Sequence, residues 1–255
     1  MSSSGGRRPL IAANWKMHLL RADVEAFCRI LGEGLGTPVA QVVLFPSHPL
    51  LSSASWAIGA HAPGVALGGQ DLHPEDHGAF TGDVAGPQLR DAGCSWVLCG
   101  HSERRRDHGE SDDLVGRKVA AAERAGLIPL LCIGERREER HSGKTFSVLE
   151  RQLAAGLVSR PSRFAIAYEP VWAIGTGETA TPEIAAETHV FLRRRLSALY
   201  GERIASQTRL VYGGSVTPVN AAELYRSAEV DGFLVGGASL DAGKFLDILG
   251  VSGSA

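Results

Sequence analysis

The chain has 255 residues, of which 44% are hydrophobic and 21% are charged, proportions that are ordinary for a folded globular protein and exclude a disordered chain. Its 26 basic and 28 acidic residues give a formal charge of −2, and no long run of one sign occurs. The charge therefore supplies no field for sequence-independent binding of nucleic acid or of a membrane surface.

The first eight residues, MSSSGGRR, contain no apolar segment of the kind that forms a signal peptide. We expect residues 1–8 to be a flexible tail and residues 9–250 to form a single domain. No later stretch reaches the roughly 18 consecutive apolar residues that a membrane-spanning helix needs. The cysteines lack metal-binding spacing, and we expect them to be reduced, mostly buried thiols of a cytoplasmic protein. They are Cys28, Cys94, Cys99 and Cys132.

Short apolar runs alternate with longer amphipathic stretches along the chain. A short continuous apolar run is typical of a strand that is buried on both faces, as in a parallel sheet. In chain order the runs span residues 10–13, 42–45, 65–67, 96–99, 128–133, 164–168, 210–212 and 232–235. The helical patterns between them span residues 24–35, 114–125, 148–157, 182–200 and 219–226. Thr181 followed by Pro182 predicts the start of the fourth of these helices.

This alternation predicts an α/β protein, a single (β/α)8 barrel in which eight parallel strands are surrounded by helices. The alternative, an open doubly wound sheet, lacks support because no GxGxxG motif follows the first strand. The active site of such a barrel lies at the carboxyl-terminal ends of its strands. The residues that follow each strand are therefore the candidates for function.

Polar side chains follow the first, fourth and sixth predicted strands. Asn14 and Lys16 follow the first, and a lysine at the barrel mouth offers a compact positive charge for a phosphate or a developing oxyanion. His101 follows the fourth and is a candidate hydrogen-bond donor or acid. Glu169 follows the sixth, and partial shielding from water is expected to raise its pKa toward neutrality, so that it can accept a proton. From position alone, each is also compatible with a structural or solvated side chain.

Two glycine pairs follow the last two predicted strands, in YGGSV (212–216) and LVGGAS (234–239). Glycine lets backbone N–H groups approach a ligand closely, and the loops after strands seven and eight of this fold often bind phosphate. The segment PVWAIGTGET (170–179) carries Trp172 and Ile174, which are costly to expose to water. We expect this segment to close as a lid; the alternative is an ordinary loop whose tryptophan packs locally.

Metal chemistry and a Ser/His/Asp triad find little support. Glu138, Glu139 and His141 lie together, but EERH lacks the paired histidines of HExxH. Ser215 lies in GGSV and not in a GxSxG turn. No metal site is expected.

The motifs NWKMH, CGHSERR, AYEPVWAIGTG, YGGSV and VDGFLVGGASL resemble those of triosephosphate isomerases and occur in the same order. The stretches GQDLHPEDHGAFTGD, HGESDDLVGRK and LLCIGE match as well, so the resemblance extends over nearly all of residues 9–250. It implies an isomerase that interconverts dihydroxyacetone phosphate and D-glyceraldehyde 3-phosphate by proton transfer through an enediolate, in glycolysis and gluconeogenesis. It also implies that no cofactor or metal takes part.

The resemblance implies a role for each residue in these motifs. Glu169 would be the base that moves a carbon-bound proton, and His101 would be a neutral electrophile. Lys16, assisted by Asn14, would offset the charge of the enediolate, and residues 170–180 would form the lid. The residues implied to hold the phosphate are Gly175, Ser215, Gly236 and Gly237, and those implied to support the site are Ser102, Glu103 and Thr81.

The segment 70–83, QDLHPEDHGAFTGD, is a long loop after the third predicted strand. Loops of about a dozen residues without secondary structure are usually functional or disordered, and Leu72 and Phe80 argue against disorder. Apolar residues on a protruding loop indicate a partner surface. In the resembled family the matching loop inserts into the neighbouring subunit. This implies a homodimer in which Thr81 approaches Asn14 and Lys16 of the partner subunit.

Two positions depart from the usual pattern of the family, since Glu178 stands where lysine is usual and His18 where asparagine is common. Three other functions are alternatives to the isomerase. Another phosphate-binding barrel, such as a sugar-phosphate isomerase of amino-acid biosynthesis, would share the glycine loops but not EPVWAIGTG or GHSERR. A Schiff-base aldolase would need a buried lysine on a strand, whereas the sixth strand ends in Glu169. A barrel that has become a binding or scaffold protein would not be expected to keep Lys16, His101 and Glu169.

Overall fold

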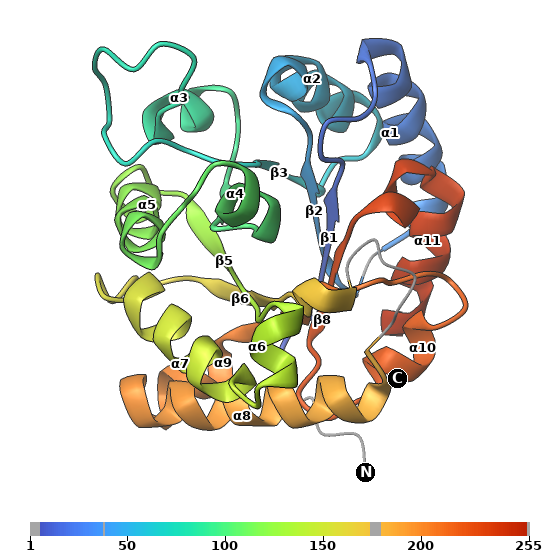
Figure 1. The fold of residues 1–255 in the computed structure, drawn as a ribbon. Coiled ribbons are helices and arrows are strands. Elements are labelled where there is room, and N and C mark those ends of the chain that lie inside the picture. Colours follow the sequence, from blue (N-terminus) through green and yellow to red (C-terminus); the bar gives the residue numbers. More distant parts are fainter. Residues whose placement is uncertain (1–5, 38, 174–179, 254–255) are drawn as a thin grey trace.

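In the computed structural model, which describes residues 6–37, 39–173 and 180–253, eight parallel strands close into a barrel (Figure 1). Each strand pairs with its neighbours in chain order, and β8 pairs with β1 to complete the ring. Every expected strand is confirmed, and its ends lie within two residues of the expected ones. The strands are β1 (Leu10–Asn14), β2 (Gln41–Phe45), β3 (Ala66–Gly69), β4 (Trp96–Cys99), β5 (Ile128–Ile133), β6 (Ala165–Tyr168), β7 (Arg209–Tyr212) and β8 (Gly232–Val235).

Helices cover the outside of the barrel (Figure 1). The expected helix 182–200 is α8, and Thr181 caps it because its Oγ1 accepts a hydrogen bond from the amide of Ile184 at 3.4 Å. The other four expected helices correspond to α1, α5, α7 and α10, whereas α2 and α11 are not predicted from the sequence. The helices are α1 (Arg21–Leu35), α2 (Leu51–His61), α3 (Gly86–Asp91), α4 (Ser102–Asp107), α5 (Asp112–Arg124), α6 (Arg137–His141), α7 (Thr145–Gly156), α8 (Pro182–Tyr200), α9 (Glu202–Gln207), α10 (Ala221–Tyr225) and α11 (Ala242–Gly250), with 3-10 turns η1 (His48–Leu50), η2 (Val171–Ala173), η3 (Gly237–Leu240) and η4 (Val251–Gly253). Within the described ranges, no helix combines the length and the apolar character needed to cross a membrane.

Side chains alternate between two hydrophobic cores along each strand. In β1, Leu10 and Ala12 belong to the core inside the barrel, whereas Ile11 and Ala13 belong to the core between the strands and the helices. Burial on both faces explains why the strands are continuous apolar runs in the sequence.

Two arginines of the expected tail contact the barrel. Arg7 donates from Nε to Asp231 at 2.7 Å and from Nη2 to Glu229 at 2.8 Å. Arg8 donates to two backbone carbonyls in the segment before β2. The bonds of Arg7 fasten the segment before β1 to the segment before β8, and those of Arg8 fasten it to the segment before β2. The expectation of a flexible tail stays a prediction for residues 1–5, which lie outside the described residues.

The four cysteines are free and buried, as expected for structural thiols. Burial raises the pKa of Cys28 to about 11 and that of Cys94 to about 12. These thiols therefore stay protonated and unreactive at neutral pH.

The segment 70–83 leaves β3 and passes outside the barrel before α3, at the upper left of Figure 1. Leu72 is only 1% exposed and packs in the core of its own chain, so the expectation that it lies on a partner surface is wrong. Phe80 is 44% exposed, and Thr81 is exposed as well.

A buried ion cluster anchors the start of this loop. Lys118 Nζ lies 2.6 Å from Asp71 and 2.5 Å from Glu110. Arg104 pairs with the same two carboxylates, at 2.9 Å and 2.7 Å. The buried Glu110 and the partly buried Asp71 thus share two cations, and removing one cation would leave one of the two negative charges without compensation.

Candidate active site

A cavity of about 280 Å³ lies at the carboxyl-terminal end of the barrel, where the residues that follow β1, β4, β6, β7 and β8 converge. At least three other cavities, of about 380, 550 and 690 Å³, are larger, so the side chains rather than the size distinguish this one. Its lining includes Asn14, Lys16, His101, Glu169, Ser215, Gly236 and Gly237.

Glu169 follows β6, and only 2% of its surface is exposed. Its carboxylate accepts hydrogen bonds from the amide of Ser102 at 2.9 Å and from the Ser102 hydroxyl at 3.2 Å, and His101 Nε2 lies 3.0 Å from Oε1. Burial raises the pKa of Glu169, but His101 and the bonds from Ser102 together lower it more, so that it lies below its ordinary value. The expectation of a raised pKa is therefore wrong for this arrangement.

His101 caps the start of α4 and is 6% exposed. Its Nδ1 accepts a hydrogen bond from the amide of Glu103 at 3.3 Å, so the ring proton sits on Nε2 and is donated to Glu169. Burial lowers the pKa of His101, but the carboxylate of Glu169 more than offsets this, and the pKa is raised. The main raising contact is with Glu169, and its contribution is lost whenever that carboxylate turns away, whereas the smaller contribution of Glu103 remains.

Lys16 lies in the loop after β1 and has a φ of 51°, a left-handed conformation that residues other than glycine rarely adopt. Two side chains hold it there. Asn14 Oδ1 accepts a hydrogen bond from the amide of Lys16 at 3.0 Å, and Gln70 Nε2 donates to the Lys16 carbonyl at 2.8 Å. The ammonium group pairs with Glu103 at 2.6 Å. Backbone strain of this kind is typical of functional sites.

The loops after β7 and β8 form the opposite wall of the cavity. A Cβ on Gly236 would stand 3.5 Å from Cε of Lys16, so the lysine stem lies against this backbone. Nothing lies within 4 Å of the Cβ position of Gly237, which leaves its backbone open to a ligand. Trp15 Nε1 donates to the carbonyl of Ser239 at 3.1 Å, and Ser239 Oγ donates to the carbonyl of Gly236 at 2.7 Å. The loop after β8 is thereby tied to the loop after β1.

The family model for triosephosphate isomerase matches residues 9–252 of the chain. The chain belongs to the triosephosphate isomerase family. Triosephosphate isomerases from Moorella thermoacetica and Alkalilimnicola ehrlichii are each 46% identical to it, over 95% of this chain and 98% of theirs. The crystal structure of triosephosphate isomerase from Bartonella henselae is 42% identical and has a TM-score of 0.87, covering 96% of this chain and 98% of that one.

Its reaction is the interconversion of dihydroxyacetone phosphate and D-glyceraldehyde 3-phosphate, a step of glycolysis and gluconeogenesis. Membership of the triosephosphate isomerase family also decides against the aldolase, the other sugar-phosphate isomerases and the inactive scaffold. Among the described residues, no group of three or more His, Cys, Asp or Glu side chains could hold a metal ion.

The structure brings most of the candidate residues of this isomerase together in one place. Seven line the cavity, and Ser102 and Glu103 touch three of those seven. Thr81 is exposed on the segment 70–83 and is not among the residues that line the cavity. Gly175, like Ile174 and Glu178, lies outside the described residues.

Two buried side chains next to the site, Glu135 and Gln152, are not singled out by the sequence. Glu135 accepts hydrogen bonds from Trp172 Nε1 at 2.8 Å and from the Tyr168 hydroxyl at 3.2 Å, and it thereby holds the first turn of the expected lid. The amide of Gln152 bridges the N–H of Gly134 at 2.8 Å and its carbonyl at 3.2 Å. The rule of polar strand ends would have found Glu135, which follows β5, whereas nothing in the sequence marks Gln152.

Gly134 packs directly against the backbone of Glu169. A Cβ on Gly134 would lie 1.7 Å from the carbonyl oxygen of Glu169, so no larger residue fits without a shift. Because Gln152 fixes both polar groups of Gly134, the loop after β5 is a rigid support for Glu169 in this isomerase.

Proposed function

We propose that Glu169 is the base of this isomerase and that His101 is its electrophile. Glu169 removes a proton from C1 of dihydroxyacetone phosphate while Nε2–H of His101 donates a hydrogen bond to the oxygen on C2, and the electron pair is held as an enediolate. Glu169 then returns the proton to C2, and His101 assists proton transfer between the two oxygens. The product is D-glyceraldehyde 3-phosphate.

The observation that carries this proposal is the 3.0 Å contact between His101 Nε2 and the Glu169 carboxylate in the lining of one cavity. One small molecule can therefore touch both groups. When Glu169 turns from Ser102 and His101 toward a substrate, it leaves the contacts that lower its pKa, while the burial that raises it persists. The carboxylate thus becomes a stronger base at the moment when it meets the substrate.

Lys16 and the glycine loops hold the two ends of the substrate. The ammonium of Lys16 offsets the charge of the enediolate, and Asn14 keeps its loop in place. Glu103 and Ser102 hold Lys16 and Glu169 before substrate arrives. The phosphate is bound by backbone N–H groups of Gly175, Ser215, Gly236 and Gly237.

The segment 170–180 closes over the substrate as a lid. Its first turn is tied to the barrel by the bond from Trp172 Nε1 to Glu135. Closure excludes water, which strengthens the electrostatic contacts inside and keeps the enediolate from losing its phosphate.

We also propose that the working unit is a homodimer formed through the segment 70–83. Two large apolar side chains face solvent in the single chain: Met17 in the loop after β1 is 93% exposed, and Phe80 on the segment is 44% exposed. Gln70, the first residue of the segment, already bonds to Lys16 in the same chain. Thr81 of the segment supports the loop at Asn14 and Lys16 of the partner subunit.

Deleting residues 73–79 tests the homodimer. We expect a monomer by light scattering and activity lower by about two orders of magnitude or more, because the partner no longer positions Lys16. A fully active monomer would contradict the role of the segment, and a wild-type monomer at micromolar concentration would contradict the dimer.

The cytoplasm is the proposed compartment, since the four thiols are free and buried. Fractionation of cells that produce the protein should recover it there. Recovery in the secreted fraction would contradict this assignment.

Glu169→Asp tests the base. The substitution withdraws the carboxylate by one methylene, roughly 1 Å, and a misplacement of that size can lower kcat about 10²-fold while leaving KM little changed. The matched control is Glu138→Asp, at an exposed position of α6, which should keep wild-type activity in the coupled assay. A kcat near the wild-type value for Glu169→Asp would remove Glu169 from this role.

A further inference from the structure

A second cavity, of about 550 Å³, lies at the amino-terminal end of the barrel. Ile128 and Arg209 in its lining are the first residues of β5 and β7, and Phe164 immediately precedes β6. The path along β6 from Phe164 to Glu169 is about 16 Å, at roughly 3.3 Å per residue. The cavity is therefore separate from the active site, and its volume lies in the range of small-molecule sites, about 300–1,000 Å³.

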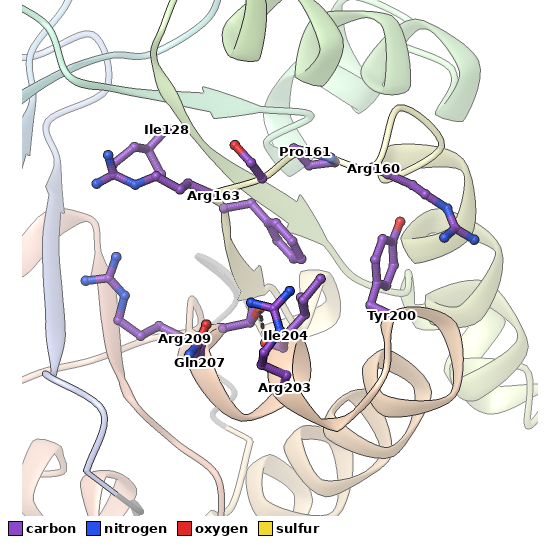
Figure 2. Close-up of a pocket in the computed structure, with 12 residues that line it drawn as sticks. Ile128, Arg160, Pro161, Arg163, Tyr200, Arg203, Ile204, Gln207 and Arg209 are labelled. Atoms are coloured by element: carbon purple, nitrogen blue, oxygen red, sulfur yellow. Dashed lines mark hydrogen bonds between the residues drawn. The ribbon is translucent and has the colours of Figure 1, made fainter.

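Four arginines line this cavity, and none of the described lining residues is acidic. Figure 2 shows Arg163 and Arg209 on one side, Arg203 in the middle, and Arg160 beside Tyr200 on the opposite side. In the described part of the chain, no carboxylate forms an ion pair with any of the four. A recess lined by charges of one sign concentrates the field and attracts ions of the opposite sign.

Neighbouring positive charges affect the pKa of Arg209 in this cavity. Burial lowers the pKa of Arg209, and the guanidinium groups of Arg8 and Arg163 lower it further. Asp231 opposes this effect, but its carboxylate is already paired with two other arginines, each at 2.7 Å. A bound anion would relieve this repulsion.

Aromatic rings, not carboxylates, hold two of these arginines in place. The guanidinium of Arg209 lies 5.1 Å from the centre of the Trp96 ring, and its Nη1 also donates to Gln41 Oε1 at 2.5 Å. The guanidinium of Arg160 lies 5.6 Å from the centre of the Tyr200 ring. Tyr200 also packs against Phe164, with ring centres 6.0 Å apart. Stacking orients a guanidinium and leaves most of its N–H groups free for an oxyanion.

We propose that this cavity binds a compound with a chain of two or more phosphate groups, either inorganic polyphosphate or the phosphate chain of a nucleotide. Arginine forks match phosphate oxygens in pairs, and the spread of the four groups across the cavity suits a chain better than a single phosphate. Binding of phosphate chains at this end is a second function beside the isomerase reaction. The KM for the triose phosphate stays unchanged because the two sites do not overlap.

Calorimetric titration of the full chain with tripolyphosphate and, separately, with magnesium-free ATP tests the proposal. Each titration is run first without and then with saturating glycerol 3-phosphate, which occupies the active site. We expect one molecule bound per chain, with affinity that falls as salt is added. If ATP binds more tightly than tripolyphosphate, the ligand is a nucleotide whose base contacts the Tyr200 ring. If the two affinities are equal, the cavity recognises the phosphate chain alone.

Arg163→Gln/Arg203→Gln should weaken binding at least about tenfold. Arg194→Gln/Arg226→Gln removes the same charge at positions outside the cavity and should leave the affinity unchanged. Melting temperatures show whether each variant is folded, and Arg160→Gln/Arg163→Gln replaces the first variant if it is not.

Four results would overturn the proposal. These are no binding to the wild type at about 1 mM of either compound, equal affinity of the cavity variant and the wild type, equal weakening by the control variant, and loss of binding when glycerol 3-phosphate is present.

Discussion

Gly134→Ala is expected to displace the base without altering it. The new Cβ would lie 1.7 Å from the carbonyl oxygen of Glu169, whereas real Cβ atoms essentially never approach another atom within 3.0 Å. The two segments must therefore separate by about 1.3 Å or more, the difference between these distances. Gln152 holds Gly134 on both sides, so most of the shift falls on Glu169. A misplacement of about 1 Å costs about 10²-fold, and kcat should fall by that order.

The coupled isomerase assay gives kcat, and thermal unfolding followed by circular dichroism shows whether the variant is folded. The matched control is Gly59→Ala in α2, where nothing lies within 4 Å of the new Cβ. It should keep wild-type activity and gain about 0.5–1 kcal/mol in the free energy of unfolding. A folded Gly134→Ala with kcat within about threefold of the wild type would refute the reasoning that this contact sets the position of Glu169.

Three other contacts of the molecule lead to predictions of their own. Ser102→Ala removes one of the bonds that lower the pKa of Glu169, so this pKa rises. The acidic limb of the kcat/KM profile, which requires ionised Glu169, should therefore move to higher pH. An unmoved limb would count against Glu169 as the base. Saturating glycerol 3-phosphate should slow amide hydrogen exchange in the segment 170–180, and unchanged exchange would argue against the lid. Lys118→Met leaves two carboxylates one cation short and should lower the free energy of unfolding in urea by about 3–5 kcal/mol, whereas Lys244→Met at an exposed position should change it by less than about 0.5 kcal/mol.

The strands and the residues at their ends could be predicted from the sequence, because burial on both faces leaves continuous apolar runs with a sharp polar boundary. Helix α2 could not. Its sequence, LSSASWAIGAH, is small or apolar almost throughout and lacks the polar face on which the helical period depends. Uniform burial thus makes the strands predictable, and the cap at Thr181 marks the start of α8, a helix that its pattern also predicts.

The pKa values of the site residues could not be predicted from the sequence. The pKa of Glu169 depends on donors in the loop after β4, and Ser102 is separated from it by 67 positions in the chain. Nothing in the sequence gives the direction of those donors. The left-handed backbone of Lys16 likewise has no local signal, since glycine is the residue that usually marks this conformation. Leu72 is buried because its loop folds back on the barrel, which composition does not reveal.

The pairing of β1 with β8 has a consequence for how the protein is made. Leu10 pairs with Gly232, so β1, the first strand to leave the ribosome, cannot complete its pairing until β8, the last strand, has been made. At about 5–20 residues per second, one edge of β1 stays unpaired for roughly 10–45 s. An open strand edge invites pairing with other chains, so a nascent chain that stalls before Gly232 exposes the same hazard for as long as it stalls. The bonds from Arg7 to Asp231 and Glu229 then fasten the seam as soon as the ring closes.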